Sequence, residues 1–262
     1  MHDLTGEGEL RALLLKSGAS FDTVVLDSTY ETDGRLTGLA MKRRSARLPG
    51  SKIIRSKPRG LNEAEGVPGG LQLNGDWRVW WRRPSCWRDD FAYPAGGTVI
   101  NIVCGNDTNF YMPALDTLHT TRRPSQRMDR LRSFFRGAQP DLGTSADRLR
   151  SMPLFSESFG MIGWALDVIG NRTHCDRDGL LIRARWAGEG RRPAVWRFVD
   201  EYHLLVDIER GVLLSLAGIV DGQQAVVMSV RSIEFDTVIP DTVFAFEPPA
   251  GTRIVWHRGS AG

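Results

Sequence analysis

Hydrophobic and polar positions alternate with the period of a β-strand in many short segments of this chain. In residues 75–82, GDWRVWWR, the side chains of Trp77, Val79 and Trp81 fall on one side of an extended strand. Turn-forming residues separate such segments at short intervals, a spacing typical of antiparallel strands and predicting about ten of them. The others are residues 21–30, 87–91, 98–104, 109–113, 164–173, 180–187, 202–207, 212–220 and 224–235.

Two strand pairs carry a recognisable turn. Asp221-Gly222 is a dipeptide that two-residue hairpins favour, and it predicts that the strands on either side of it pair. Near the N-terminus, Thr-Asp-Gly at 32–34 is read as a turn. We therefore predict a hairpin between residues 21–30 and a strand over 36–43.

Helical spacing is confined to short segments. Leu10, Leu13 and Leu14 share one face of a helix predicted over residues 9–17. A second helix is predicted within residues 119–136. No alternation of strands with helices occurs, which argues against a parallel sheet. The pattern predicts a mainly β (α+β) chain.

Composition narrows the function classes. The chain has 262 residues and a formal net charge of +3, which does not by itself indicate nucleic-acid binding. Eight basic residues and no acidic one occur in residues 42–59, and residues 119–136 are basic as well. These runs are interpreted either as solvated loops or as contacts to an anion or a phospholipid headgroup.

The three cysteines give an indication of the cellular compartment in which the protein works. Cys86, Cys104 and Cys175 are widely spaced and form no CxxC pair, so we expect reduced thiols, as in a cytosol. The N-terminus has no export signal as it stands, and no apolar run approaches the roughly 18 residues of a membrane-spanning helix. We expect a cytoplasmic protein, with prior removal of an export signal as the alternative.

Catalytic and metal-binding motifs are missing from the sequence. The five histidines show no HExxH or HxH spacing, and neither GxSxG nor a phosphate-binding glycine loop occurs. Asp89 and Asp90 are adjacent on a strand, so they point to opposite faces, and we expect ion pairs with Arg82, Arg83 or Arg88. The sequence predicts no metal, no cofactor and, on balance, no enzyme.

The C-terminal part carries a distinctive motif. Residues 239–251 read Ile-Pro-Asp-x-x-Phe-x-Phe-x-Pro-Pro-x-Gly, after a strand ending in Val-Asp and a hairpin. Together with Trp80-Trp81-x-Arg-Pro-x-x-Trp-Arg at 80–88 and Gly-x-x-x-x-Phe-Tyr-x-Pro at 105–113, this resembles the LolA-like lipoprotein-carrier superfamily, which includes LppX and the RseB N-terminal domain.

The resemblance implies a single LolA-like domain over residues 1–262, with its core at about 10–255. The family fold is a strongly curved antiparallel sheet, an unclosed half-barrel with a few short helices in its mouth. Relatives in bacteria carry lipids or lipoproteins, or sense envelope stress beside an anti-sigma factor. The resemblance therefore predicts a non-catalytic carrier of a hydrophobic molecule or lipid, with an anionic head and membrane-surface contact as further options and no nucleic acid.

The apolar face of the sheet supplies the predicted ligand site, since an uncovered apolar concavity is a binding site by default. Its expected members come from four strands: Trp77, Val79, Trp81, Leu204, Leu214, Leu216 and Met228.

Two other functions remain open. An enzyme on the same scaffold would bind or cyclise a hydrophobic intermediate, using an acid within the apolar face. Its candidates are Asp207, Glu234 and Asp236. A regulatory module would instead bind another protein through an exposed apolar patch.

Overall fold

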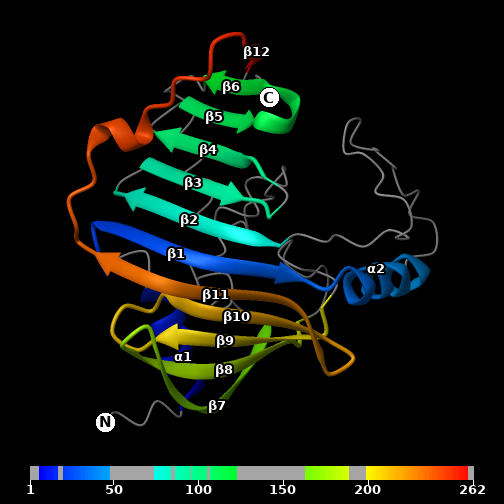
Figure 1. Ribbon diagram of the computed structural model, residues 1–262. Coiled ribbons are helices and arrows are strands. Elements are labelled where there is room, and N and C mark those ends of the chain that lie inside the picture. Colours follow the sequence, from blue (N-terminus) through cyan, green and yellow to red (C-terminus); the bar gives the residue numbers. More distant parts are fainter. Residues whose placement is uncertain are drawn as a thin grey trace. The chain divides into compact units, whose positions relative to one another are not determined.

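The computed structural model describes residues 6–16, 20–47, 74–83, 86–94, 96–104, 107–122, 163–188 and 199–258. Strands dominate these residues, and the two α-helices among them are short. Figure 1 shows the elements in chain order: α1 (Glu7–Lys16), β1 (Thr23–Thr32), α2 (Gly34–Arg47), β2 (Gly75–Arg82), β3 (Cys86–Ala92), β4 (Thr98–Cys104), β5 (Asp107–Met112), η2 (Pro113–Leu115), β6 (Thr117–Arg122), β7 (Trp164–His174), β8 (Arg177–Trp186), β9 (Glu201–Asp207), β10 (Leu213–Val220), β11 (Gln223–Phe235), η3 (Asp241–Phe244) and β12 (Arg253–Arg258).

The strands form one sheet in the order β12-β6-β5-β4-β3-β2-β1-β11-β10-β9-β8-β7. β12 and β7 stand at the two ends of this order, so the sheet is open. The ladders from β2 to β6 and from β7 to β11 are antiparallel, whereas β12 pairs with β6 in parallel. The predicted class, a mainly β chain with an unclosed antiparallel sheet and few helices, is confirmed.

The chain divides into two compact units. Unit 1 comprises residues 1–17, 29–74 and 153–229, and unit 2 comprises residues 18–28, 75–152 and 230–262. β1 and β11 each contribute residues to both units.

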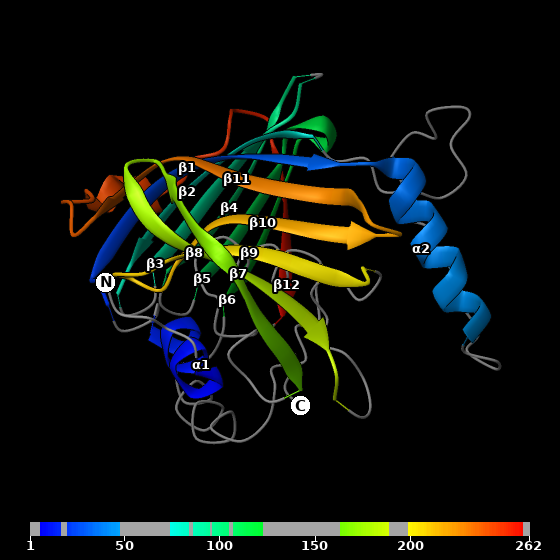
Figure 2. The same ribbon diagram turned by 90° about the horizontal axis from the view of Figure 1, so that it is seen from below.

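Unit 1 contains α1 and the strands β7 to β10, which Figure 2 labels. Leu10, Leu13 and Leu14 are buried along one face of the helix, as their spacing predicts. Arg11 fixes the helix to the start of β7, because its Nη2 donates a hydrogen bond to the Trp164 carbonyl at 2.7 Å. The predicted N-terminal helix is confirmed.

The second helix corrects the sequence analysis. Residues 36–43 were predicted to form a strand, but they belong to α2. Asp33, read as part of a turn, caps the helix instead, since its Oδ1 accepts a hydrogen bond from the Leu36 amide at 2.9 Å. Leu36 and Ala40 are buried at helical spacing. The sequence therefore contained both signals of the helix, the capping residue Asp33 and the helical spacing of Leu36 and Ala40.

Unit 2 contains the ladder from β2 to β6. β6 spans Thr117–Arg122 and so includes the start of the basic segment at 119–136; the helix predicted within that segment does not include these residues. After β11, residues 236–246 run past β2, β3 and β4 through η3, and the chain then reaches β12 beside β6 (Figure 1). We call residues 236–246 the C-terminal strap.

Several predicted features lie outside the described residues. They are the basic run from residue 48 to residue 59 and, from residue 123 onward, the segment at 119–136 in which a helix is predicted. Within the described part of the chain, no helix is both long and apolar enough to cross a membrane.

Candidate ligand-binding face

One face of unit 2 gathers aromatic and aliphatic side chains in three rows. The cross-strand register of β2, β3 and β4 places Trp81 beside Trp87 and Val103, and Trp77 beside Phe91 and Val99. Val79, Asp89 and Asn101 form the row between them. Phe110 of β5 continues the middle row as the partner of Asn101. We call this surface of β2 to β5 the aromatic face.

Burial differs across the aromatic face. Trp77 and Val79 are almost fully buried, whereas Trp81, Phe91 and Phe110 are half-buried. Val99 and Val103 are half-buried too. Half-buried apolar side chains in adjacent rows leave apolar surface that a hydrophobic molecule can cover.

Packing contacts fix the aromatic rings at opposite ends of β2. The Phe91 ring lies against Gly75, where a Cβ atom would come within 2.8 Å of that ring. At the other end, Trp81 meets Phe21 edge to face, with ring centroids 5.2 Å apart. The Arg83 guanidinium lies 5.8 Å from the Trp81 ring centroid. These rings are held in place by packing before any ligand binds.

A polar cluster interrupts the aromatic face at its centre. The Asp89 carboxylate is buried, and its Oδ2 accepts hydrogen bonds from the Trp87 indole at 2.6 Å and from the Asn101 amide at 2.8 Å. A carboxylate held in this way within apolar surroundings can orient a polar group of a ligand. The alternation in the sequence predicts that Asp89 and Asp90 point to different faces of the strand. It does not predict that Asp89 contacts Asn101, because that contact depends on the register of β3 with β4.

The opposite face of the same strands is covered by the C-terminal strap. Ile239 and Phe244 of the strap pack with Cys86 and Ile102 in a buried cluster. Arg88 donates a hydrogen bond to the Val243 carbonyl at 3.0 Å and pairs with Asp90 at 2.7 Å. The predicted ion pair of the Asp89-Asp90 segment is thus confirmed for Asp90 with Arg88.

Cys86 and Cys104 form a disulfide, which corrects the expectation of reduced thiols. The two residues are direct partners in the β3–β4 ladder, with Cα atoms 4.1 Å apart. Their separation of 18 residues did not reveal this contact, because register brings them together. Cys175 lies outside the disulfide. The cytoplasmic expectation rested partly on three reduced thiols and loses that support.

The predicted ligand residues divide between the units. Trp77, Val79 and Trp81 belong to unit 2 and share the aromatic face, as their alternation predicts. The other four, Leu204, Leu214, Leu216 and Met228, belong to unit 1 and have no exposed surface. Leu204, Leu216 and Met228 stand in one row across β9, β10 and β11. For these four residues a role in a ligand site stays a prediction.

Two of the three acids considered for catalysis make contacts that stabilise other parts of the protein. Asp207 pairs with Arg177 and also accepts a hydrogen bond from the Arg210 amide, which stabilises the turn after β9. Asp236 accepts a hydrogen bond from the Asp22 amide, and Glu234 is exposed. The described residues contain no group of three or more His, Cys, Asp or Glu side chains placed to hold a metal ion.

Unit 1 has a separate concavity where β1 meets α2. Its volume is about 570 Å³, and polar side chains make up much of its wall. Because a hydrophobic ligand needs apolar walls, the aromatic face of unit 2 is the better candidate. The wall includes Glu31, Asp33, Arg35, Asn74 and Gln224.

Comparison with known proteins gives structural matches alone. No family matches the sequence, and no curated protein matches it. The fold is similar to that of a LolA superfamily protein from Nitrosomonas europaea, with a TM-score of 0.34 and 10% identity over 90% of this chain and 97% of that one. It is also similar to the lipoprotein LppX of Mycobacterium tuberculosis, with a TM-score of 0.42 and 10% identity over 90% and 99% of the two chains.

A third match is the MucB structure solved in a complex of Pseudomonas aeruginosa MucA and MucB. The TM-score is 0.48, with 11% identity over 92% of this chain and 61% of that chain. The present chain therefore spans less than two thirds of the matched protein. These similarities concern the fold alone.

Proposed function

We propose that this protein binds a hydrophobic small molecule or lipid on the aromatic face of unit 2 and carries it without changing it chemically. The observation behind the proposal is the set of half-buried apolar side chains in adjacent strands, among them Trp81, Phe91 and Phe110. Apolar area of this kind drives binding when a ligand removes it from water.

The polar cluster around Asp89 would orient the bound ligand. Asp89 sits in the middle row with Asn101 and Val79, so a ligand lying along β3 or β4 passes close to its carboxylate. An apolar molecule with one hydroxyl or amine group fits this arrangement better than a pure hydrocarbon. A negatively charged headgroup would have to bind away from Asp89. Much of the two basic segments, residues 42–59 and 119–136, lies outside the described residues.

The test titrates the protein with 11-(dansylamino)undecan-1-ol, a neutral long-chain alcohol that carries a fluorescent tag. We expect saturable enhancement of dansyl fluorescence and energy transfer from tryptophan. Phe110→Ala removes apolar area from the aromatic face and should weaken binding about tenfold, the equivalent of roughly 1.4 kcal/mol.

The matched control is Trp256→Ala, which removes an aromatic ring that is 71% exposed on β12 and lies outside the aromatic face. Its affinity should equal that of the wild type. The proposal fails if the wild-type protein shows no saturable binding, or if both variants lose affinity equally.

A further inference from the structure

The Cys86–Cys104 disulfide lies directly beneath the C-terminal strap. Cys86 is buried with Ile102 against Ile239 and Phe244, and Cys104 packs against the same cluster. The strap contributes two further apolar side chains to this contact, Val243 and Phe246. The two sulfur atoms therefore form part of the surface on which the strap rests.

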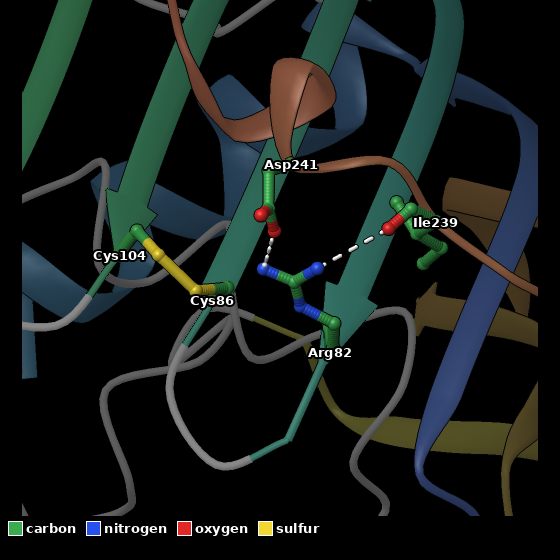
Figure 3. Close-up of a disulfide and its surroundings, with 5 residues drawn as sticks. All are labelled: Arg82, Cys86, Cys104, Ile239 and Asp241. Carbon is green, nitrogen blue, oxygen red and sulfur yellow. Dashed lines mark hydrogen bonds and ion pairs between the residues drawn. A yellow bond between two sulfur atoms is a disulfide. The ribbon is translucent and has the colours of Figure 1, made fainter.

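The residue opposite Cys86 in the β2–β3 ladder, Arg82, holds the strap at the same place. Its guanidinium pairs with Asp241 at 2.7 Å and donates a hydrogen bond to the Ile239 carbonyl at 3.2 Å. The guanidinium carbon also lies 4.8 Å from the ring centroid of Phe244. Figure 3 shows Arg82 reaching the strap beside the disulfide.

The start of the strap is fixed independently of the disulfide. Thr23 Oγ1 donates a hydrogen bond to the Thr237 carbonyl at 2.6 Å, and the Asp236 amide donates one to the Thr23 carbonyl at 2.9 Å. Beyond the strap, the Arg253 amide donates to the Asp116 carbonyl, and β12 pairs with β6. A change at the disulfide thus acts on a strap that stays attached through the residues before and after it.

We propose that the Cys86–Cys104 disulfide is a redox-responsive lock that keeps the C-terminal strap seated on β2, β3 and β4. Bonded sulfur atoms approach more closely than unbonded ones, so two thiols need more room than the disulfide. Protein interiors are close-packed, and the added room must come from the contacts with Ile239 and Phe244. Reduction also removes a covalent link that restrains β3 against β4.

The redox step is a thiol–disulfide exchange with a dithiol reductant. One thiolate of the reductant attacks a sulfur of the pair, the Cys86–Cys104 bond breaks, and a mixed disulfide forms. The second thiolate then displaces the remaining cysteine. Two electrons pass to the cysteines, which take up two protons, and the reductant leaves as a cyclic disulfide. Cys104 is half-buried, so a reductant can reach the pair.

This lock acts on the strap side of unit 2 and does not depend on ligand binding to the aromatic face. Disulfides persist in oxidising compartments, where the lock would be closed. A dithiol donor in such a compartment is the class of partner that opens it.

The test is hydrogen–deuterium exchange of the full chain carrying Cys175→Ser, measured before and after reduction with dithiothreitol. The substitution leaves the Cys86–Cys104 pair as the one source of thiols in the chain. On reduction we expect amides of residues 239–246 to exchange at least about tenfold faster, while β8, β9 and β10 keep their rates. Alkylation and mass measurement should find no thiol before reduction and two after it.

A Cys86→Ser/Cys104→Ser double variant of the same chain, in which two unbonded side chains replace the bonded sulfur atoms, should show the fast strap exchange with and without dithiothreitol. If this variant does not fold, the reduction experiment on the cysteine-containing chain decides alone. The proposal is overturned if reduction leaves amide exchange in the strap unchanged, or if the unreduced protein already has two free thiols. It is also overturned if exchange accelerates equally throughout β2 to β6, because the disulfide would then stabilise the whole ladder and not the strap in particular.

Discussion

The guanidinium of Arg88 lies 5.2 Å from the ring centroid of Trp80, its partner across the β2–β3 ladder. The same group makes two hydrogen bonds to the Asp90 carboxylate, at 2.7 and 2.8 Å, and one to the Val243 carbonyl of the strap. Arg88 and Asp90 are each 18% exposed. One side chain thus joins two strands, an aromatic ring and the strap.

Replacing Arg88 should therefore cost more than replacing an ordinary surface arginine. We expect Arg88→Ala to lower the free energy of unfolding by about 2 kcal/mol, since it leaves Asp90 and the Val243 carbonyl without this donor. Urea unfolding followed by tryptophan fluorescence measures the change. The control is Arg231→Ala, whose ion pair with Asp76 is exposed on both sides and should be worth less than about 0.5 kcal/mol. Equal losses in the two variants would contradict this account.

The ion pair between Arg177 and Asp207 gives a second contrast. Asp207 is 1% exposed, and its partner Arg177 also pairs with Glu209, which is 69% exposed. Asp207→Asn keeps an acceptor for the Arg210 amide but removes the buried negative charge, and should cost roughly 2–3 kcal/mol of unfolding free energy. Glu209→Gln should cost less than about 1 kcal/mol. If chemical denaturation gives the two variants the same stability, the buried pair does not have the assigned role.

The buried hydroxyl of Tyr30 should make the free energy of unfolding depend on pH in the alkaline range. Burial raises the pKa of its hydroxyl far above the ordinary value of 10.0. Above pH 10 the unfolded chain loses this proton while the folded chain keeps it, so stability is fully present below pH 10 and falls as the pH rises. The contribution of one tyrosine is at most about 1.4 kcal/mol per pH unit.

The measurement is the free energy of unfolding of the wild type and of Tyr30→Phe between pH 8 and 11.5. Phenylalanine has no proton to lose, so the variant should show a shallower decline above pH 10. The difference between the two proteins should be constant below pH 9. Parallel curves over the whole range would show that Tyr30 keeps an ordinary pKa in the folded state.

The turn between β7 and β8 makes a prediction about thiol reactivity. Burial, and secondarily the negative charge of Asp176, raise the pKa of the Cys175 thiol above its usual 9.0. Because the thiolate is the reactive form, iodoacetamide should modify Cys175 slowly at pH 8. Asp176→Asn should speed the reaction a few-fold, and burial should hold it below the rate of an exposed cysteine.

Asparagine suits this position, since Asp176 has a left-handed backbone with φ of 56° and asparagine tolerates that region. Asp178→Asn serves as the control, because that carboxylate is not among the causes of the shift. A rate that does not respond to Asp176→Asn, when followed by mass measurement, would remove the electrostatic part of the explanation.

Local patterns predicted much of the secondary structure. The alternation of Trp77, Val79 and Trp81 gave both the strand β2 and the side chains that share a face. Asp221-Gly222 gave the β10–β11 hairpin, where φ is 51° and 74° and the flanking residues pair directly. The failures were also local: Asp33 was read as a turn residue although its side chain caps α2.

The contacts within the candidate site could not be predicted from local patterns, because the alignment of neighbouring strands brings its members together. Asp89 meets Asn101, and Cys86 meets Cys104, through the alignment of β3 with β4. The strap reaches Arg82 and Arg88 from more than 150 residues away along the chain. None of these contacts has a period or spacing in the sequence that would indicate it.

The sequence by itself determined which segments extend, where most turns fall and which side chains of a strand share a face. The reason is that backbone sterics and a two-residue repeat act over a few neighbouring residues. The tertiary structure alone decided the strand order, the parallel pairing of β12 with β6, the disulfide and the surroundings of Asp89. A strand can pair with many partners in many registers at similar local cost, and the choice among them comes from packing of the whole unit.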